Sequence, residues 1–211
     1  MPLHQHFRFQ HFEIAIWEIS ESAGVLERGV KIHPSEERKF EACHRELRRQ
    51  EFLALRKCLQ QIYGDNPPVH YLASGKPYLE KGDYLSFSHT KGFAAVIKSK
   101  MLPVGIDLEG HRPGLQAIKK KFMRSEEDRW LHPESEIAHL AAYWGAKESI
   151  VKIEDNRKLD FRKHIRVHPF RYRPQQSTKA FLLGGSKKCS YRLFFRKISD
   201  LTLSYGWRLP L

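Results

Sequence analysis

The run Gly105-Ile106-Asp107-Leu108-Glu109 carries more information about fold and chemistry than any other part of this chain. In an extended strand the side chains alternate, so Asp107 and Glu109 share one face about 7 Å apart while Ile106 and Leu108 bury the other. Carboxylate oxygens are the ligands that a hard cation such as Mg²⁺ prefers. The run therefore predicts a strand that presents a divalent-cation site. For this pentapeptide alone, a solvent-facing acid pair on an edge strand is an equal alternative.

Strand and helix patterns alternate on both sides of this run, which predicts an α+β fold with two related lobes. Both halves mix the two kinds of element in similar proportion. The predicted strands are 12–19, 69–73, 84–88, 93–98, 104–109, 180–183, 191–195 and 202–207, with a turn at Gly184-Gly185-Ser186. The predicted helices are 35–63, 115–122, a short one that begins at Ser125, and 134–153.

The helix limits rest on capping signals. Ser35, followed by two glutamates, is a credible N-cap, and Gly64 followed by Asn66 and two prolines ends the same helix. Ser125 with Asp128 three residues later predicts the start of a second helix. We therefore expect one continuous helix from Ser35 to Gly64.

The second informative run is WGAKESIVK, residues 144–152, on the long helix. A spacing of four places Trp144, Glu148 and Lys152 on one stripe, with Glu148 in reach of Lys152. Taken alone, such a pair is more often helix decoration than chemistry. Gly145 costs a helix about 1 kcal/mol relative to Ala, so its presence predicts that a backbone or a ligand approaches closely there.

The third run is LSFSHT, residues 85–90. Alternation predicts that Ser86 and Ser88 face outward and that His89 ends the strand. Hydroxyl and imidazole groups can hold a phosphate, although a single histidine at a strand end is usually only a surface residue. A further histidine group, His4, His6 and His11, could form an adventitious metal site at a mobile terminus.

Composition limits the class of protein. The 211 residues are 41% hydrophobic and 29% charged, as in a globular protein, and the net charge is +13. Residues 151–211 contribute +11 of this charge and residues 1–150 only +2, which favours an acidic partner such as nucleic acid, a phosphate-rich small molecule or an acidic protein. Three cysteines without CxxC spacing predict neither disulfides nor zinc. We expect no membrane span and no signal peptide, and hence a cytoplasmic protein.

Taken in order, these runs resemble the 4′-phosphopantetheinyl transferase superfamily, in its long, pseudo-dimeric subclass typified by the surfactin and enterobactin synthetase activators. The matching pieces are GKPYL at 75–79, LSFSHT at 85–90, GIDLE at 105–109 and WGAKESIVK at 144–152. The resemblance is strong across 75–152 and weak along the Arg-rich helix. It implies two similar lobes, 1–102 for coenzyme A and 103–211 for the metal site and catalytic helix, each a small antiparallel sheet with a long helix, with the active site in the cleft between them.

The activity that the resemblance implies is Mg²⁺-dependent transfer of the phosphopantetheine arm of coenzyme A to a serine of an apo acyl or peptidyl carrier protein, with release of adenosine 3′,5′-bisphosphate. It implies Asp107, Glu109 and Glu148 as metal ligands, Glu148 also as the base that takes the serine proton, and Lys152 as the cation facing the attacked phosphate or the leaving oxygen. The residues it implies for coenzyme A phosphates are Lys76, Ser88 and His89, with Arg48 and Arg49 as looser candidates for the 3′-phosphate.

Two other functions stay open on the residues alone. A metal-dependent nuclease also needs acidic clusters, a lysine and a basic surface, and a non-catalytic nucleic-acid-binding module would explain the charge. Neither explains the Lys76 and His89 runs, so we do not expect nucleic acid as a partner. Two lobes in one chain make a monomer sufficient. The loop after Lys152 departs from the glycine-rich turn of many relatives, which leaves carrier selectivity undetermined.

Overall fold

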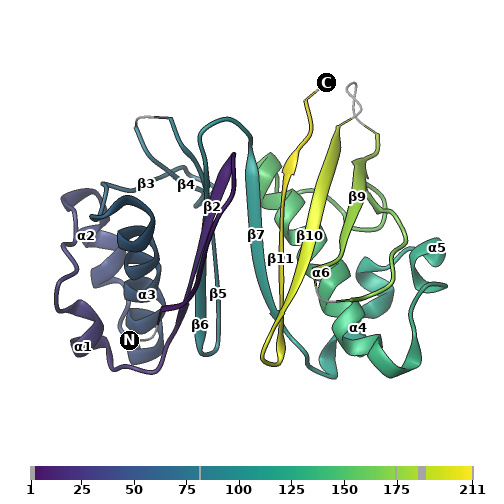
Figure 1. Ribbon diagram of the computed structural model, residues 1–211, viewed down its shortest axis with the longest axis horizontal. Coiled ribbons are helices and arrows are strands. Elements are labelled where there is room, and N and C mark those ends of the chain that lie inside the picture. Colours follow the sequence, from purple (N-terminus) through teal and green to yellow (C-terminus); the bar gives the residue numbers. More distant parts are fainter. Residues whose placement is uncertain (1–2, 81, 174, 185–188, 211) are drawn as a thin grey trace. The chain divides into compact units, whose positions relative to one another are not determined.

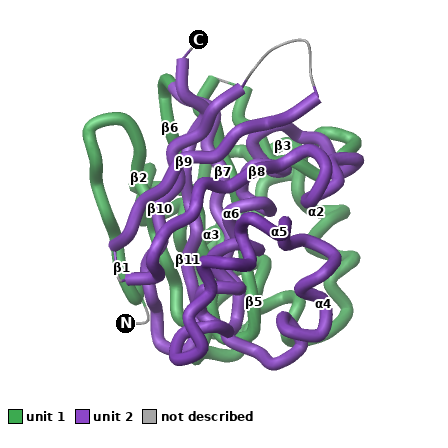
Figure 2. Tube along the Cα trace, turned by 90° about the vertical axis from the view of Figure 1, so that its right-hand side faces the viewer, with its two compact units in different colours: residues 1–101 green, residues 102–211 purple. Residues whose placement is uncertain are grey.

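The computed structural model of the chain divides into two compact units, Met1–Met101 and Leu102–Leu211 (Figure 2). It describes all residues except 1–2, 81, 174, 185–188 and 211. Each unit holds an antiparallel sheet and helices, which is the α+β class predicted from the sequence. The similarity of the lobes and the cleft between them stay predictions, and the predicted turn at 184–186 lies largely outside the described residues.

The first unit has a four-stranded antiparallel sheet in the order β1-β2-β6-β5 (Figure 1). Helix α3 (Glu46–Tyr63) packs against it because apolar side chains recur every three or four residues along one face, at Phe52, Leu55, Cys58, Leu59 and Ile62. The helix ends at Gly64, whose φ of 84° suits glycine. The strands are β1 (Leu3–Arg8), β2 (Phe12–Glu18), β5 (Tyr84–Thr90) and β6 (Phe93–Ser99), and β3 (His70–Tyr71) pairs with β4 (Pro77–Tyr78).

The helix predicted from Ser35 to Gly64 is in fact two helices, α2 (Pro34–Glu41) and α3, preceded by the short α1 (Ala23–Glu27). The reason is a buried ion pair between Glu36 of α2 and Arg56 of α3, both fully inaccessible. Twenty residues span about 30 Å in one continuous helix, so this pair can form only if the chain turns back.

Ser35 is not the N-cap of α2. The ring of His33 takes that role by accepting a hydrogen bond from the Ser35 backbone nitrogen, and the Ser35 hydroxyl donates to the Val69 carbonyl at 3.0 Å. The cap of α5 (Ser125–Asp128) also lies one residue earlier than predicted, since Arg124 precedes the helix and its backbone nitrogen donates to the Glu127 carboxylate at 2.9 Å.

The histidine-rich N-terminus is strand β1, which the sequence patterns did not indicate. It pairs with β2 along its length, so the idea of a metal site at a mobile terminus is wrong for this segment. His4 lies 3.6 Å from the Glu18 carboxylate and His6 lies 3.3 Å from that of Glu13. Both histidines therefore pair with acidic side chains of the neighbouring strand β2.

The second unit has a five-stranded antiparallel sheet in the order β7-β11-β10-β9-β8, with helix α6 (Glu136–Glu154) packed against β7 and β11 (Figure 1). Strand β8 was not predicted from the sequence. The strands are β7 (Val104–Gly110), β8 (Ile165–Val167), β9 (Ser177–Leu182), β10 (Ser190–Ile198) and β11 (Leu201–Arg208), and the other helices are α4 (Gly114–Phe122), α5 and the 3-10 turn η1 (Pro133–Ser135).

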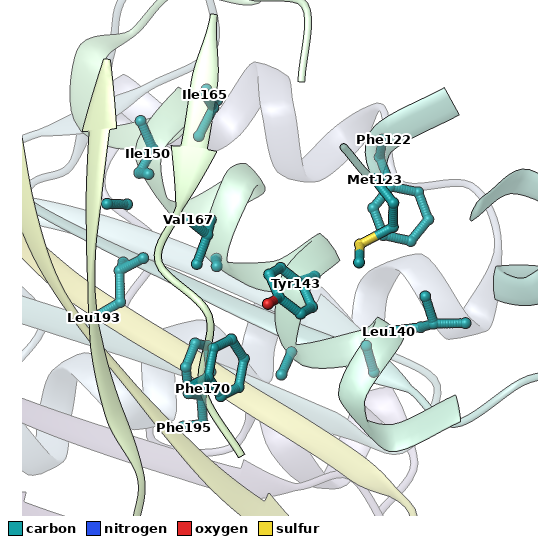
Figure 3. Close-up of a cluster of buried hydrophobic side chains, with 14 of the residues drawn as sticks. Phe122, Met123, Leu140, Tyr143, Ile150, Ile165, Val167, Phe170, Leu193 and Phe195 are labelled. Atoms are coloured by element: carbon teal, nitrogen blue, oxygen red, sulfur yellow. The ribbon is translucent and has the colours of Figure 1, made fainter. Parts of the chain in front are cut away.

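An aromatic cluster forms part of the core of this unit (Figure 3). Tyr143 of α6 lies 4.9 Å from Phe170, ring centre to ring centre, and Phe170 stacks on Phe195 of β10 at 4.5 Å. His139, one turn before Tyr143, is buried among the same rings at 4.7 Å from Phe170. Helix α6 is therefore fixed to its unit by large side chains as well as by the sheet.

The three cysteines are free, and burial raises the pKa of the Cys58 thiol, which leaves it unreactive at neutral pH. In the part of the chain that the structure describes, no helix combines the length and the hydrophobicity that a membrane crossing requires.

Candidate functional site

Strand β7 places Asp107 and Glu109 on one face, as the alternation predicts. β11 fixes the register of β7 by pairing along it, with Asp107 opposite Ser204 and Glu109 opposite Thr202. The face is not open to solvent, because Asp107 is only 7% exposed. The alternative of an exposed acid pair on an edge strand is therefore wrong for Asp107.

Helix α6 covers this face at very short range, and glycines make the approach possible. A Cβ at Gly105 would lie 2.2 Å from the carbonyl oxygen of Ser149, and a Cβ at Gly145 would lie 2.5 Å from the Ser204 hydroxyl oxygen and 3.4 Å from Oδ2 of Asp107. A close approach does occur at Gly145, but the neighbours are the side chains of Ser204 and Asp107 and not a backbone or a ligand as predicted. The Asp107 carboxylate is thus held between the sheet and α6.

Lys152 reaches the same carboxylate from the last turns of α6. Its ammonium donates to Oδ1 of Asp107 at 2.8 Å and to the Ile106 carbonyl oxygen at 2.8 Å. The sequence predicted that Lys152 lies near Glu148 on one stripe of the helix. The structure directs Lys152 to a partner that no helical spacing could reveal.

The Glu148 side chain is part of the same electrostatic group. Burial raises its pKa most, and the negative charges of Asp107 and Glu109 raise it further against the opposing effect of Lys152. Burial also raises the pKa of Glu109, which Arg112 opposes through a 2.9 Å hydrogen bond. The negative charges of β7 thus favour the protonated form of Glu148, and a carboxylate with a raised pKa is the better proton acceptor.

The donor chemistry of this group fits a hard divalent cation. Beside Asp107, the buried hydroxyl of Ser204 has no hydrogen-bond partner in the described part of the chain, as expected where a further polar ligand binds. The carboxylates do not converge on one point, however. Among the described residues no three His, Cys, Asp or Glu side chains form a group that could hold a metal, and Lys152 and Arg112 hold Asp107 and Glu109.

A second ionic group anchors α6 from its other side. Lys147, which is fully buried, donates to Oε2 of Glu127 at 2.6 Å, to the Phe122 carbonyl at 2.6 Å and to the Phe161 carbonyl at 3.2 Å. The backbone nitrogen of Val167 donates to the other Glu127 oxygen at 2.9 Å. Lys147 and Glu127 were missed because a charged residue in a sequence carries no sign of burial.

In the first unit, Glu51 brings two of the predicted coenzyme A residues together. The Arg48 guanidinium donates to Oε2 of Glu51 at 2.9 Å, and Nδ1 of His89 lies 3.3 Å from the same oxygen. Glu51 is 5% exposed, so it is a buried acid beneath two exposed basic groups. The spacing of three residues between Arg48 and Glu51 is the sequence feature that could have indicated this contact.

The other predicted coenzyme A residues lie in three different surroundings in the first unit. The Arg49 guanidinium lies 4.6 Å from the ring centre of Phe40 and 4.0 Å from the Glu27 carboxylate. Lys76 lies in the turn between β3 and β4, where its carbonyl accepts from Leu72 at 3.0 Å. Ser88 is buried, 6% exposed.

Leu85 and Phe87 pack in the core of the first unit, as alternation predicts. The expectation that Ser86 and Ser88 face solvent is wrong, since Ser86 is also buried, 3% exposed. Both faces of β5 are largely covered. Alternation reveals which side chains share a face, but it does not reveal whether the polar face is covered.

Residues 103–205 match the model of the 4′-phosphopantetheinyl transferase superfamily. The match to this superfamily covers just under half of the chain and includes the acids of β7 and the residues of α6 described above. It supports a transferase of the phosphopantetheinyl type for the second unit. No curated protein matches the chain.

Proposed function

We propose that this protein transfers the 4′-phosphopantetheine arm of coenzyme A to a serine of an apo acyl or peptidyl carrier protein, in a Mg²⁺-dependent reaction that releases adenosine 3′,5′-bisphosphate. The observation that supports this most is that the span matching the superfamily contains the Asp107 carboxylate in contact with Lys152, beside Glu148 and Glu109. The proposal gives each of these residues a distinct task.

In this reaction the serine oxygen of the carrier forms a bond to the phosphorus that bears the pantetheine. The bond from that phosphorus to the bridging oxygen breaks, and adenosine 3′,5′-bisphosphate leaves with the electron pair. Glu148 accepts the serine proton, for which its raised pKa suits it. Lys152 stabilises negative charge on the attacked phosphate or the leaving oxygen.

In this proposal Asp107, Glu109 and Glu148 would hold Mg²⁺ after Asp107 and Glu109 leave their contacts with Lys152 and Arg112 and turn toward one point. When bound there, the ion supplies charge neutralisation to the pyrophosphate. The chain's own contribution is to keep the Asp107 carboxylate between β7 and α6, where the Gly105 and Gly145 contacts fix the distance between sheet and helix.

The first unit supplies the remaining groups for coenzyme A in this proposal. Arg48, His89, Lys76 and Ser88 would bind its phosphates, with Arg49 as a weaker contributor because its guanidinium lies against Phe40. Glu51 would set the orientation of Arg48 and His89 before coenzyme A binds. Charge-assisted hydrogen bonds of this kind are the strong ones in phosphate recognition.

The carrier protein is the second substrate. An excess of +11 in residues 151–211 would attract an acidic carrier and accelerate encounter. The same proposal includes a cytoplasmic location and a monomer as the active form.

The test is the intact mass of apo carrier proteins after incubation with the protein, coenzyme A and Mg²⁺. We expect a gain of one phosphopantetheine that is lost when Mg²⁺ is omitted and in Glu148→Gln. Glu134→Gln is the matched control, since Glu134 is an exposed acid of the same unit, and it should keep the full gain. No gain on any acyl or peptidyl carrier, together with undetectable coenzyme A binding, would refute the proposal.

A further inference from the structure

The acids of β7 are each held by a cationic side chain of the same unit. Lys152 lies 2.8 Å from Asp107, and Arg112 lies 2.9 Å from Glu109. The Lys152 ammonium also donates to the Ile106 carbonyl, so it is fixed from two sides. It therefore occupies Oδ1, one of the two carboxylate oxygens through which Asp107 could bind a cation.

We propose that Lys152 holds the place of the divalent cation at Asp107 until the phosphates of coenzyme A attract it away. This inference rests on the proposed function and adds a second role for Lys152 at the same site. An ammonium and a divalent cation on one carboxylate would be a few ångströms apart, and their repulsion is strong where water is scarce. Asp107 can therefore bind either the Lys152 ammonium or the divalent cation strongly, but not both at the same time.

Coupled binding of the two ligands follows. If a phosphate of coenzyme A attracts Lys152 away from Asp107, the carboxylate becomes available to the cation, and cation affinity rises. By thermodynamic linkage, the cation then raises the affinity for coenzyme A by the same factor. The protein would thus bind the metal tightly only when its substrate is present.

Lys152 should matter more than Arg112 for this effect. The side chain of Lys152 is 28% exposed and that of Asp107 is 10% exposed, whereas the side chain of Arg112 is 56% exposed. Solvent and salt screen an exposed pair more than a partly buried one. We therefore expect Lys152 to set most of the cation affinity.

The experiment is calorimetric titration of Mn²⁺ into the full chain without coenzyme A. Coupling free energies between sites correspond to factors of about 5 to 150, so we expect Lys152→Gln to bind Mn²⁺ about tenfold more tightly than the unmodified protein. Lys152→Met is the second variant and should behave alike. The matched control is Lys158→Gln, which removes one positive charge from an exposed position of the same unit and should leave the affinity unchanged.

Asp107→Asn locates the binding and should abolish the tight phase in the Lys152→Gln background. Equal or weaker Mn²⁺ binding by both Lys152 variants, in proteins that melt at the same temperature as the unmodified chain, would overturn the inference while leaving Mg²⁺-dependent transfer intact. Absence of Mn²⁺ binding in every protein, with transfer independent of Mg²⁺, would overturn the metal assignment and the inference together. A tenfold gain that Lys158→Gln reproduces would also overturn it, because net charge would then explain the effect.

Discussion

Lys147→Met should destabilise the protein more than any surface substitution, because it removes one partner of the buried ion pair between α6 and α5. Lys147 and Glu127 are both fully inaccessible, and the ammonium serves one carboxylate oxygen and two backbone carbonyls. Removing one member of a buried pair leaves an uncompensated charge and costs about 3–5 kcal/mol. That is a large part of the roughly 5–15 kcal/mol that stabilises a typical domain.

The assay is urea unfolding at pH 7, followed by far-UV circular dichroism. We expect Lys147→Met to lower the free energy of unfolding by about 3–5 kcal/mol. The double variant Lys147→Met/Glu127→Gln should regain part of this loss, because the amide carries no charge and its oxygen can still accept from the Val167 backbone nitrogen. Lys158→Gln should change stability by less than about 0.5 kcal/mol. A loss under about 1 kcal/mol for Lys147→Met, or a double variant as unstable as the sum of the two single variants, would refute this reasoning.

Three further predictions concern other parts of the molecule. Burial lowers the pKa of His139 from 6.5 to about 4, so between these pH values the unfolded chain binds a proton that the folded chain does not. The free energy of unfolding should therefore fall as pH falls through this window, by up to about 3 kcal/mol. A His139→Phe variant, compared with the unmodified chain by urea unfolding at pH 7 and pH 4.5, should lack this pH-dependent loss. Gly145→Ala should lower the free energy of unfolding by about 1–3 kcal/mol and lower transfer activity, because the added Cβ would meet the Ser204 hydroxyl. Adding Ser204→Gly to this variant should restore its stability in thermal melts. Arg48→Gln should weaken coenzyme A binding in calorimetry several-fold more than Arg49→Gln, since only Arg48 joins His89 at Glu51; equal losses would contradict this placement.

The sequence patterns predicted the elements of the second unit more accurately than those of the first. Alternation around Asp107 and helical spacing around Glu148 are local signals, and both predicted elements are present as β7 and α6. The division of the predicted helix at 35–63 depends on the contact between Glu36 and Arg56, which lies beyond any local pattern. Propensity describes a segment in isolation, whereas a buried ion pair between two segments decides where the chain turns.

The candidate site shows the same limit. The roles of Glu148 and Lys152 came from the resemblance to the 4′-phosphopantetheinyl transferase superfamily, whereas residue type and spacing indicated a cation site at Asp107. They did not indicate that Lys152 contacts Asp107, because that contact joins a helix to a strand far away in the sequence. They also gave no sign of Ser204, whose importance arises only from its position opposite Asp107. The identity of site residues is thus largely local information, and their partners are not.

The order of strands has a consequence for how the protein is made. β7 opens the second unit and β11 closes it, yet the two are neighbours in the sheet, with Asp107 opposite Ser204. Pairings between residues so distant in the chain form slowly and late. On the ribosome, the strand that carries the acids emerges long before the strand that fixes their register. A growing chain would thus carry Asp107, Glu109, Glu148 and Lys152 before their positions are fixed. Activity would begin only after β11 pairs with β7.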